Sequence, residues 1–235
     1  MRTKKEDQVM VNEHVLEVRF RPSGTFVDKR GLIADYIVEK GQFSYWRIET
    51  NVVNFQDMEG GIKRVGGFVS FRNVGYVAYD PQTKNFFEDK AISFWKDFLS
   101  NPHFDLPLIT RFGLRTKTFI TSNSNFESLE SKMFSKFFRT DVEDIVGGKR
   151  SDLQIVFDLS EDNFKSRLLL GPLHKDEANR HFSFSSEHFK ATGTYIDCDI
   201  YQEKTVNQSE VPLLVKKAME LVWQKIDLIS QALEL

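Results

Sequence analysis

The sequence predicts an α+β fold in which helices cover one face of a mostly antiparallel sheet. Segments that alternate apolar and polar residues, as half-buried strands do, occur in both halves of the chain. Segments with apolar residues at helical spacing separate groups of these strands. Several strands follow one another across short turn segments, which predicts hairpins and therefore antiparallel pairing.

Composition agrees with a globular protein. The chain has 235 residues, of which 40% are hydrophobic and 28% are charged, so it can bury a full core. Its 22 phenylalanines predict an aromatic-rich core. We expect a flexible N-terminus at 1–13 and a single domain at 14–235.

Charge and cysteine content limit the functional classes. A net charge of −2 and a pI of about 6.2 argue against a mainly electrostatic nucleic-acid binder. The single cysteine, Cys198, excludes an intramolecular disulfide and a multi-cysteine zinc site. The charged start of the chain is unlike a secretory signal, and no apolar run is long enough for a membrane helix. We therefore expect a cytoplasmic protein without membrane contact.

The first half begins with a strand whose Leu16, Val18 and Phe20 alternate with polar residues. Gly41 stands where a helix C-terminal cap belongs. In 45–56, Trp46 would begin an apolar face. The predicted elements are a strand at 15–22, a helix at 28–40, strands at 45–56 and 68–80 that form a hairpin around a turn at 60–67, and a helix at 85–100.

The second half repeats this order loosely. The predicted elements are a strand at 108–120, a helix at 125–138, a loop at 141–150, paired strands at 152–160 and 164–173, an irregular or weakly extended segment at 177–190, a strand at 192–202, and a long helix from about Ser209. We therefore consider two β-α-β-β-α halves, 14–104 and 105–235, sharing one sheet. The short similarity between their first strands agrees with duplication or with chance.

Two strands of opposite charge are the main functional signal. Alternate residues point to the same face of a strand. In 108–120, one face carries the cations Arg111, Arg115 and Lys117, with Gly113 between the arginines. In 195–201, one face carries Tyr195, Asp197, Asp199 and Tyr201.

These side chains have two interpretations if both strands belong to one sheet. They are either surface ion pairs, each worth about 0–1 kcal/mol, or a polar surface that binds a protein partner or an anionic ligand. Gly113 would allow close approach of a ligand or backbone.

One of these strands also suggests a family. The sequence LITRFGLR at 108–115, preceded by FWKDFL at 94–99, resembles the R-x-G-L-R core of a sporadically distributed, uncharacterised prokaryotic family of about this length. The resemblance extends to a first strand like VLEVRF and a late strand like IDCDIY before the last helix. It implies framework roles for Arg111, Gly113, Arg115, Asp197 and Asp199, and it implies no particular activity.

Catalytic motifs are weak. The five histidines form no recognised metal motif, and Cys198 falls on the apolar face of its strand. Asp197 and Asp199 could hold Mg²⁺ if a third acidic group lay nearby. A metal-dependent phosphoryl-transfer or nuclease-type enzyme is therefore an alternative, although we predict no catalytic residue, metal ligand or cofactor.

Aromatic and basic residues in the first half suggest a second alternative. A base-stacking platform could be formed by Tyr45, Trp46, Arg47, Phe71 and Arg72. A nucleic-acid-binding module is disfavoured by the net charge and by the lack of RNP-type motifs. The leading hypothesis is a non-enzymatic binding protein, which could also form homo-oligomers, with Arg111, Arg115, Lys117, Tyr195, Asp197, Asp199 and Tyr201 at its binding surface.

Overall fold

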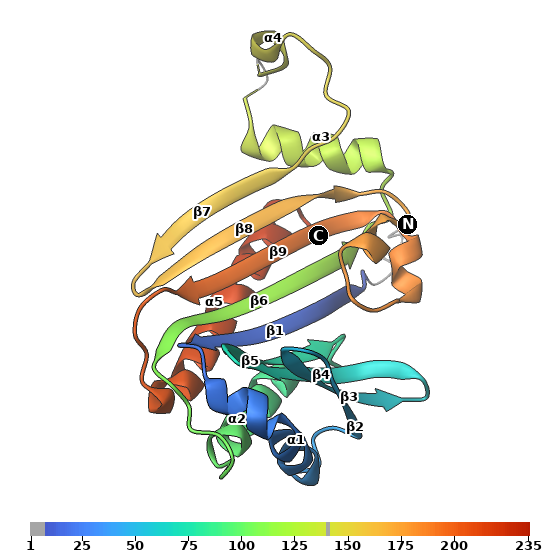
Figure 1. Ribbon diagram of the computed structural model, residues 1–235. Coiled ribbons are helices and arrows are strands. Elements are labelled where there is room, and N and C mark those ends of the chain that lie inside the picture. The colour runs from blue at the N-terminus through green and yellow to red at the C-terminus, as the bar shows by residue number, and fades with distance from the viewer. Residues whose placement is uncertain (1–7, 140–141) are drawn as a thin grey trace.

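The computed structural model describes residues 8–139 and 142–235 (Figure 1). The strands are β1 Met10–Phe20, β2 Tyr45–Ile48, β3 Val52–Glu59, β4 Ile62–Ser70, β5 Asn73–Tyr79, β6 Ile109–Thr121, β7 Ile155–Glu161, β8 Phe164–Leu173 and β9 Gly193–Gln202. The α-helices are α1 Gly24–Glu39, α2 Phe86–Leu99, α3 Phe126–Phe137, α4 Val142–Val146 and α5 Val211–Ala232. Within these ranges, no helix is both long enough and apolar enough to cross a membrane.

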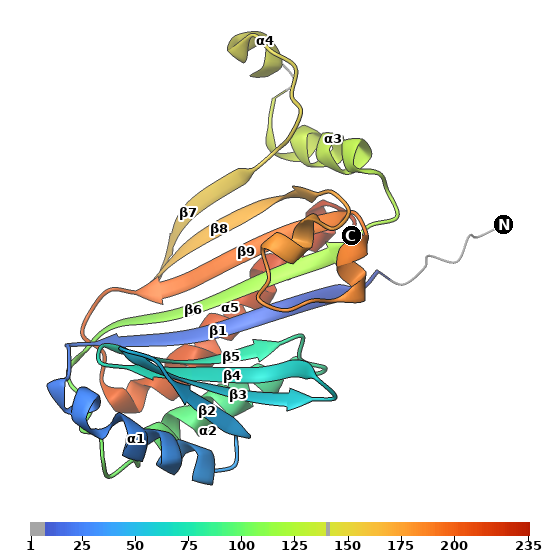
Figure 2. The ribbon, with the colours of Figure 1, turned by 45° about the vertical axis from the view of Figure 1, so that its right-hand side comes forward.

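The strands form one sheet in the order β2-β3-β4-β5-β1-β6-β9-β8-β7, and each neighbouring pair is antiparallel. Helices α1, α2 and α5 contribute Ile33, Phe94 and Val222 to a single core on one face of this sheet. Figure 1 shows α5 behind the sheet and the connection between β8 and β9 in front, and Figure 2 shows the same layers turned by 45°. The predicted α+β class is confirmed.

The two halves share an order of elements, although neither matches the predicted β-α-β-β-α pattern, because four strands follow α1 and three follow α3. Each half begins with a strand and a helix, continues with a meander of antiparallel strands, and ends with a helix. The first strand of each half pairs with the last strand of its own meander, β1 with β5 and β6 with β9. Strands β1 and β6 pair with each other at the centre. Duplication of the sequence itself remains a prediction.

Some predicted elements of the first half are wrong. A turn divides 45–56 into β2 and β3, closed by a hydrogen bond from the Glu49 amide to the Val52 carbonyl. This turn contains neither glycine nor proline, so it carries no strong sequence signal. Segment 62–67, predicted as a turn, belongs to β4, where Gly67 makes room for the ring of Phe43.

Two other boundaries also differ from the prediction. Residues 10–13, predicted as flexible, belong to β1, and Val11 is fully buried; residues 1–7 lie outside the described part. The loop predicted at 141–150 contains the short helix α4.

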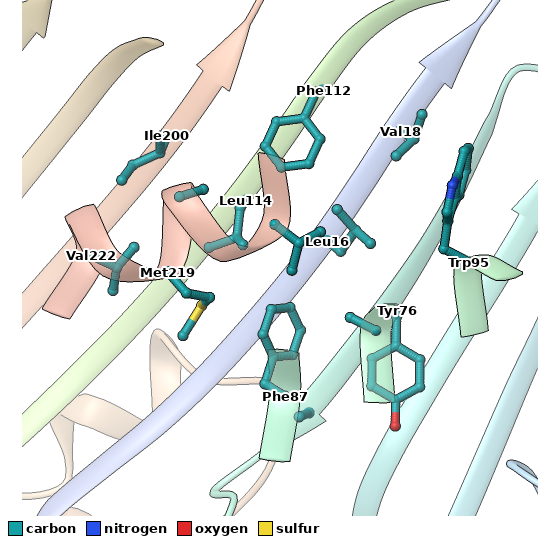
Figure 3. Close-up of a cluster of buried hydrophobic side chains, with 14 of the residues drawn as sticks. Leu16, Val18, Tyr76, Phe87, Trp95, Phe112, Leu114, Ile200, Met219 and Val222 are labelled. Carbon is teal, nitrogen blue, oxygen red and sulfur yellow. The ribbon is translucent and has the colours of Figure 1, made fainter. Parts of the chain in front are cut away.

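Alternation along the central strands builds the core. Leu16 and Val18 of β1, together with Phe112 and Leu114 of β6, point toward the helices (Figure 3). Met219 and Val222 of α5 lie among them. Residues between these positions face the other way, which leaves the opposite face of the sheet to polar side chains.

A buried histidine interrupts this apolar layer. The imidazole of His14 is 1% exposed and lies against the rings of Phe87 and Trp223. Its Nδ1 atom lies 2.9 Å from the Thr116 hydroxyl, whereas Nε2 has no hydrogen-bond partner among the described residues. Burial lowers the pKa of His14 from 6.5 to about 4, because this site disfavours the charged imidazolium.

We therefore predict an acid-sensitive fold. Between pH 6.5 and about 4 the unfolded chain binds a proton at His14 and the folded chain does not. The stability contributed by neutral His14 is complete above pH 6.5 and is lost as the pH falls toward 4, by about 3 kcal/mol in total. Denaturant unfolding of wild type and His14→Gln across this range measures the effect. The variant should show a flatter dependence, and identical pH slopes would contradict the assignment.

Candidate functional site

The seven predicted site residues lie on the sheet face opposite the helices, which we call the open face. Strands β6 and β9 are neighbours, and Arg115 pairs in register with Asp199, as Lys117 does with Asp197. Their neighbours Leu114 and Cys198 lie in the core. The predicted juxtaposition of basic and acidic strands is therefore present, while a binding role for these residues remains a prediction.

Strand β1 adds acidic residues that the sequence-based prediction did not include. Glu13 lies opposite Lys117, and Glu17 lies opposite Gly113. Charged and apolar residues alternate in the first strand, which predicts a charged face for it. The sequence does not show that this strand pairs with β6, so these acidic residues could not be assigned to the site.

One ion pair of the open face, between Arg115 and Asp197, runs diagonally across β6 and β9. Arg115 donates from Nε to Asp197 Oδ1 at 2.8 Å and from Nη2 to Asp197 Oδ2 at 2.5 Å. The hydroxyl of Tyr195 also donates to Asp197 Oδ2, at 3.2 Å. Hydrogen bonding to Asp197 raises the pKa of Arg115, and burial raises the pKa of Tyr195. Asp197 is thus fully engaged by Arg115 and Tyr195.

Arg111 occupies the space above Gly113. A Cβ atom at Gly113 would lie 2.6 Å from Arg111 Nη1. From this position the guanidinium contacts Glu17 and Asp199, each at 3.4 Å, and lies 4.9 Å from the ring centre of Tyr201. The expectation that Gly113 leaves room for a ligand is therefore wrong, because a side chain of the same strand fills that room.

Asp199 is more weakly held than Asp197. Its side chain is 32% exposed, against 11% for Asp197. Burial raises the pKa of Asp199, and the nearby cations Arg111 and Arg115 only partly oppose this shift. Of the two acidic residues of β9, Asp199 is therefore the more exposed to solvent.

The connection between β8 and β9, residues 174–192, covers one end of the open face. Phe182 and Phe189 form a second small core with Val11, Phe119 and Tyr195. This segment contains two 3₁₀ helices, Glu177–Arg180 and Glu187–Lys190, so its irregular character agrees with the sequence-based alternative.

Glu13 anchors this cover. Its carboxylate accepts hydrogen bonds from the amide and hydroxyl of Ser183 and pairs with Lys117 Nζ at 2.7 Å. Lys117 and Tyr195 are therefore largely shielded from solvent, as is Arg111, and the accessible part of the predicted site consists of Arg115, Asp199 and Tyr201.

The accessible charged surface continues onto the strands beyond β9. Arg167 of β8 lies opposite both Asp199 and Asp158 of β7, and Lys165 lies opposite Tyr201. The side chains of Arg167 and Lys165 are each 59% exposed. Five cavities of 240 to 660 Å³ in the described part of the molecule are lined by none of the seven predicted residues. The seven residues thus lie on a charged surface outside these five cavities.

The two alternative hypotheses gain no geometric support. In the described ranges, no three His, Cys, Asp or Glu side chains are grouped so as to hold a metal ion. The third acidic ligand that the phosphoryl-transfer hypothesis needs is therefore not found there. The proposed base-stacking platform is divided, because Tyr45 and Arg47 project from one face of β2 and Trp46 from the other.

Comparison of the chain with protein-family models and with curated proteins finds no match.

Gly75 of β5 and Gly113 of β6 lie opposite Glu17 on its two sides, and replacing each with alanine gives a pair of comparable predictions. A Cβ at Gly75 would lie 2.4 Å from the backbone oxygen of Leu16, whereas at Gly113 it would meet only the flexible end of Arg111. We expect Gly75→Ala to lower the free energy of unfolding by about 3 kcal/mol through overpacking. Gly113→Ala should cost only about 1 kcal/mol through the displaced ion pairs. Denaturant titration measures both; equal losses would refute the proposed position of Arg111.

The diagonal ion pair gives a second prediction. Because Arg115 is half exposed, its coupling to Asp197 should be about 1 kcal/mol after solvent screening. A double-mutant cycle with Arg115→Gln and Asp197→Asn measures this energy. The matched cycle with Asp199→Asn should give a smaller value, although Asp199 lies directly opposite. A larger coupling to Asp199 would contradict the geometry described here.

Proposed function

We propose that this protein is a non-enzymatic binding protein that contacts another protein chain through the open face of its sheet. One observation carries the proposal: exposed charges of both signs lie side by side on neighbouring strands. The exposed members of this surface are Arg19, Arg115, Asp158, Lys165 and Arg167, and Asp199, which lies among them, is partly exposed.

The local pairing favours a protein partner over a small anionic ligand. Arg115 and Arg111 already have carboxylate partners, so a small anion would have to compete with Asp197 or Asp199. A protein surface that carries both signs can pair with the cations and with the carboxylates together. Complementary charge of this kind contributes mainly to specificity and to the rate of association.

The side chains of the open face are held in place by one another, which supports a binding role more than a catalytic role. Arg115, Asp197 and Tyr195 hold one another, and the anchored connection between β8 and β9 limits movement at one end of the face. A second copy of the chain is one candidate for the partner. The cytoplasm remains the proposed location.

The test compares two charge-reversal variants of equal charge change. Lys165→Glu/Arg167→Glu reverses exposed cations of the open face, whereas Lys29→Glu/Lys217→Glu reverses exposed lysines of α1 and α5. Native mass measurement of gently purified protein should show an associated chain, or a second copy, with wild type and with the helix variant. The open-face variant should weaken this association at least about tenfold.

Deuterium exchange of the complex provides the second readout. Protection should be confined to the strands that carry these charges, β1, β6, β7, β8 and β9. Equal loss of the partner from both variants, or protection on the helices alone, would refute the proposal.

A further inference from the structure

A cavity of about 540 Å³ lies at one end of the first half of the sheet, apart from the open-face site. It is bounded by the end of β3, the start of β4, the end of β5 and the first turns of α2. Its volume is in the range of small-molecule sites. Its walls combine apolar side chains, such as Met58 and Phe86, with a small number of polar groups.

Tyr76 reaches this cavity from the core. Its ring packs against Phe43, Phe87 and Phe94, and the residue is only 1% exposed. Figure 3 shows its hydroxyl directed away from the other labelled side chains. No described residue forms a hydrogen bond with this hydroxyl, and its oxygen is not fully enclosed by protein atoms. The phenol therefore presents an unsatisfied polar group to the cavity that it lines.

The electrostatic surroundings of this hydroxyl are negative. Asp57 and Asp80 line the cavity, and neither forms an ion pair with another described residue. Asp57 accepts a hydrogen bond from the Ser44 hydroxyl, and Asp80 accepts one from the Asn12 amide at 3.4 Å, in each case through Oδ1. Burial raises the pKa of Tyr76, and the negative charge of Asp57 adds to this shift.

The basic residues that line the cavity, Arg64 and Lys90, are fewer than its acidic residues, so the charge of the lining remains negative. Arg64 is paired with Glu59 at 3.1 Å, and Lys90 is solvent-exposed on α2. Burial raises the pKa of Asp80, and the Asn12 amide, His188 and Arg64 oppose this shift only in part, so a further cation beside the carboxylate would favour its charged form. An anionic ligand would instead meet the carboxylates of Asp57, Glu59 and Asp80, whose charge Arg64 and Lys90 only partly balance.

We infer that this cavity binds a small organic ammonium ion with an apolar body. Asp57 and Asp80 supply the negative charge, and the Tyr76 hydroxyl supplies a hydrogen bond. Phe86 and Met58 contact the apolar body, and the aromatic rings also favour a nearby cation. This inference concerns a different site from the open face and does not depend on the proposed function.

Titration calorimetry with a matched pair of probes tests the inference. Phenethylamine and 3-phenylpropionate have a similar phenyl-bearing body and opposite charge. We expect phenethylamine to bind at least about tenfold more tightly, and Asp57→Asn to weaken its binding by about tenfold or more. Tyr76→Phe should weaken binding severalfold without lowering the melting temperature, because its hydroxyl has no protein partner. Tyr36→Phe, which removes a hydroxyl on α1, should change neither affinity.

Three results would overturn the inference. The first is equal or tighter binding of 3-phenylpropionate. The second is unchanged phenethylamine affinity in Asp57→Asn. The third is the absence of binding by both phenethylamine and butylamine at millimolar concentrations to folded wild-type protein.

Discussion

The antiparallel pairing of β1 with β6 is the interaction on which the rest of the structure depends. It joins the two halves of the chain into one sheet, and its register fixes both faces at once. Leu16 and Leu114 meet on the helix side, while Glu13 and Lys117 meet on the open face. A shift of one residue in one strand would turn its charged side chains into the core. Core packing and charge pairing therefore specify the same register.

The open face is organised by how deeply each charge is covered. At one end, Glu13 and Lys117 lie under the connection between β8 and β9, where loss of one partner would leave a buried charge. Toward β8 and β7 the pairs are exposed and contribute little to stability. The covered pair is thus buried within the fold, whereas the charges of Lys165 and Arg167 remain in contact with solvent. The solvent exposure of the charged side chains therefore increases from the covered end of the open face toward β8 and β7.

Residue alternation predicted much of the fold, because one buried face imposes a period of two on a strand. The sequence LITRFGLRTKTFI of β6 therefore predicted its own two faces, as IDCDIY of β9 did. Alternation cannot specify which strands are neighbours, so the contributions of Glu13 and Glu17 were missed. Alternation gives the face on which a side chain lies but not its rotamer. Only the structure shows that Arg115 pairs diagonally with Asp197 and that Arg111 lies over Gly113. The turn at 49–51 was missed because it lacks glycine and proline.

Formation of a disulfide across β6 and β9 would measure their register directly, because Cys198 lies opposite Thr116. Opposed residues of antiparallel strands have Cα atoms within disulfide range, whereas diagonal positions are generally too far apart. Oxidative refolding of Thr116→Cys should therefore give a disulfide with Cys198, detected as a mass loss of two hydrogens. Thr118→Cys, one pleat farther along the same face, should remain a dithiol. A disulfide in Thr118→Cys, with none in Thr116→Cys, would contradict the register and the charged surface derived from it.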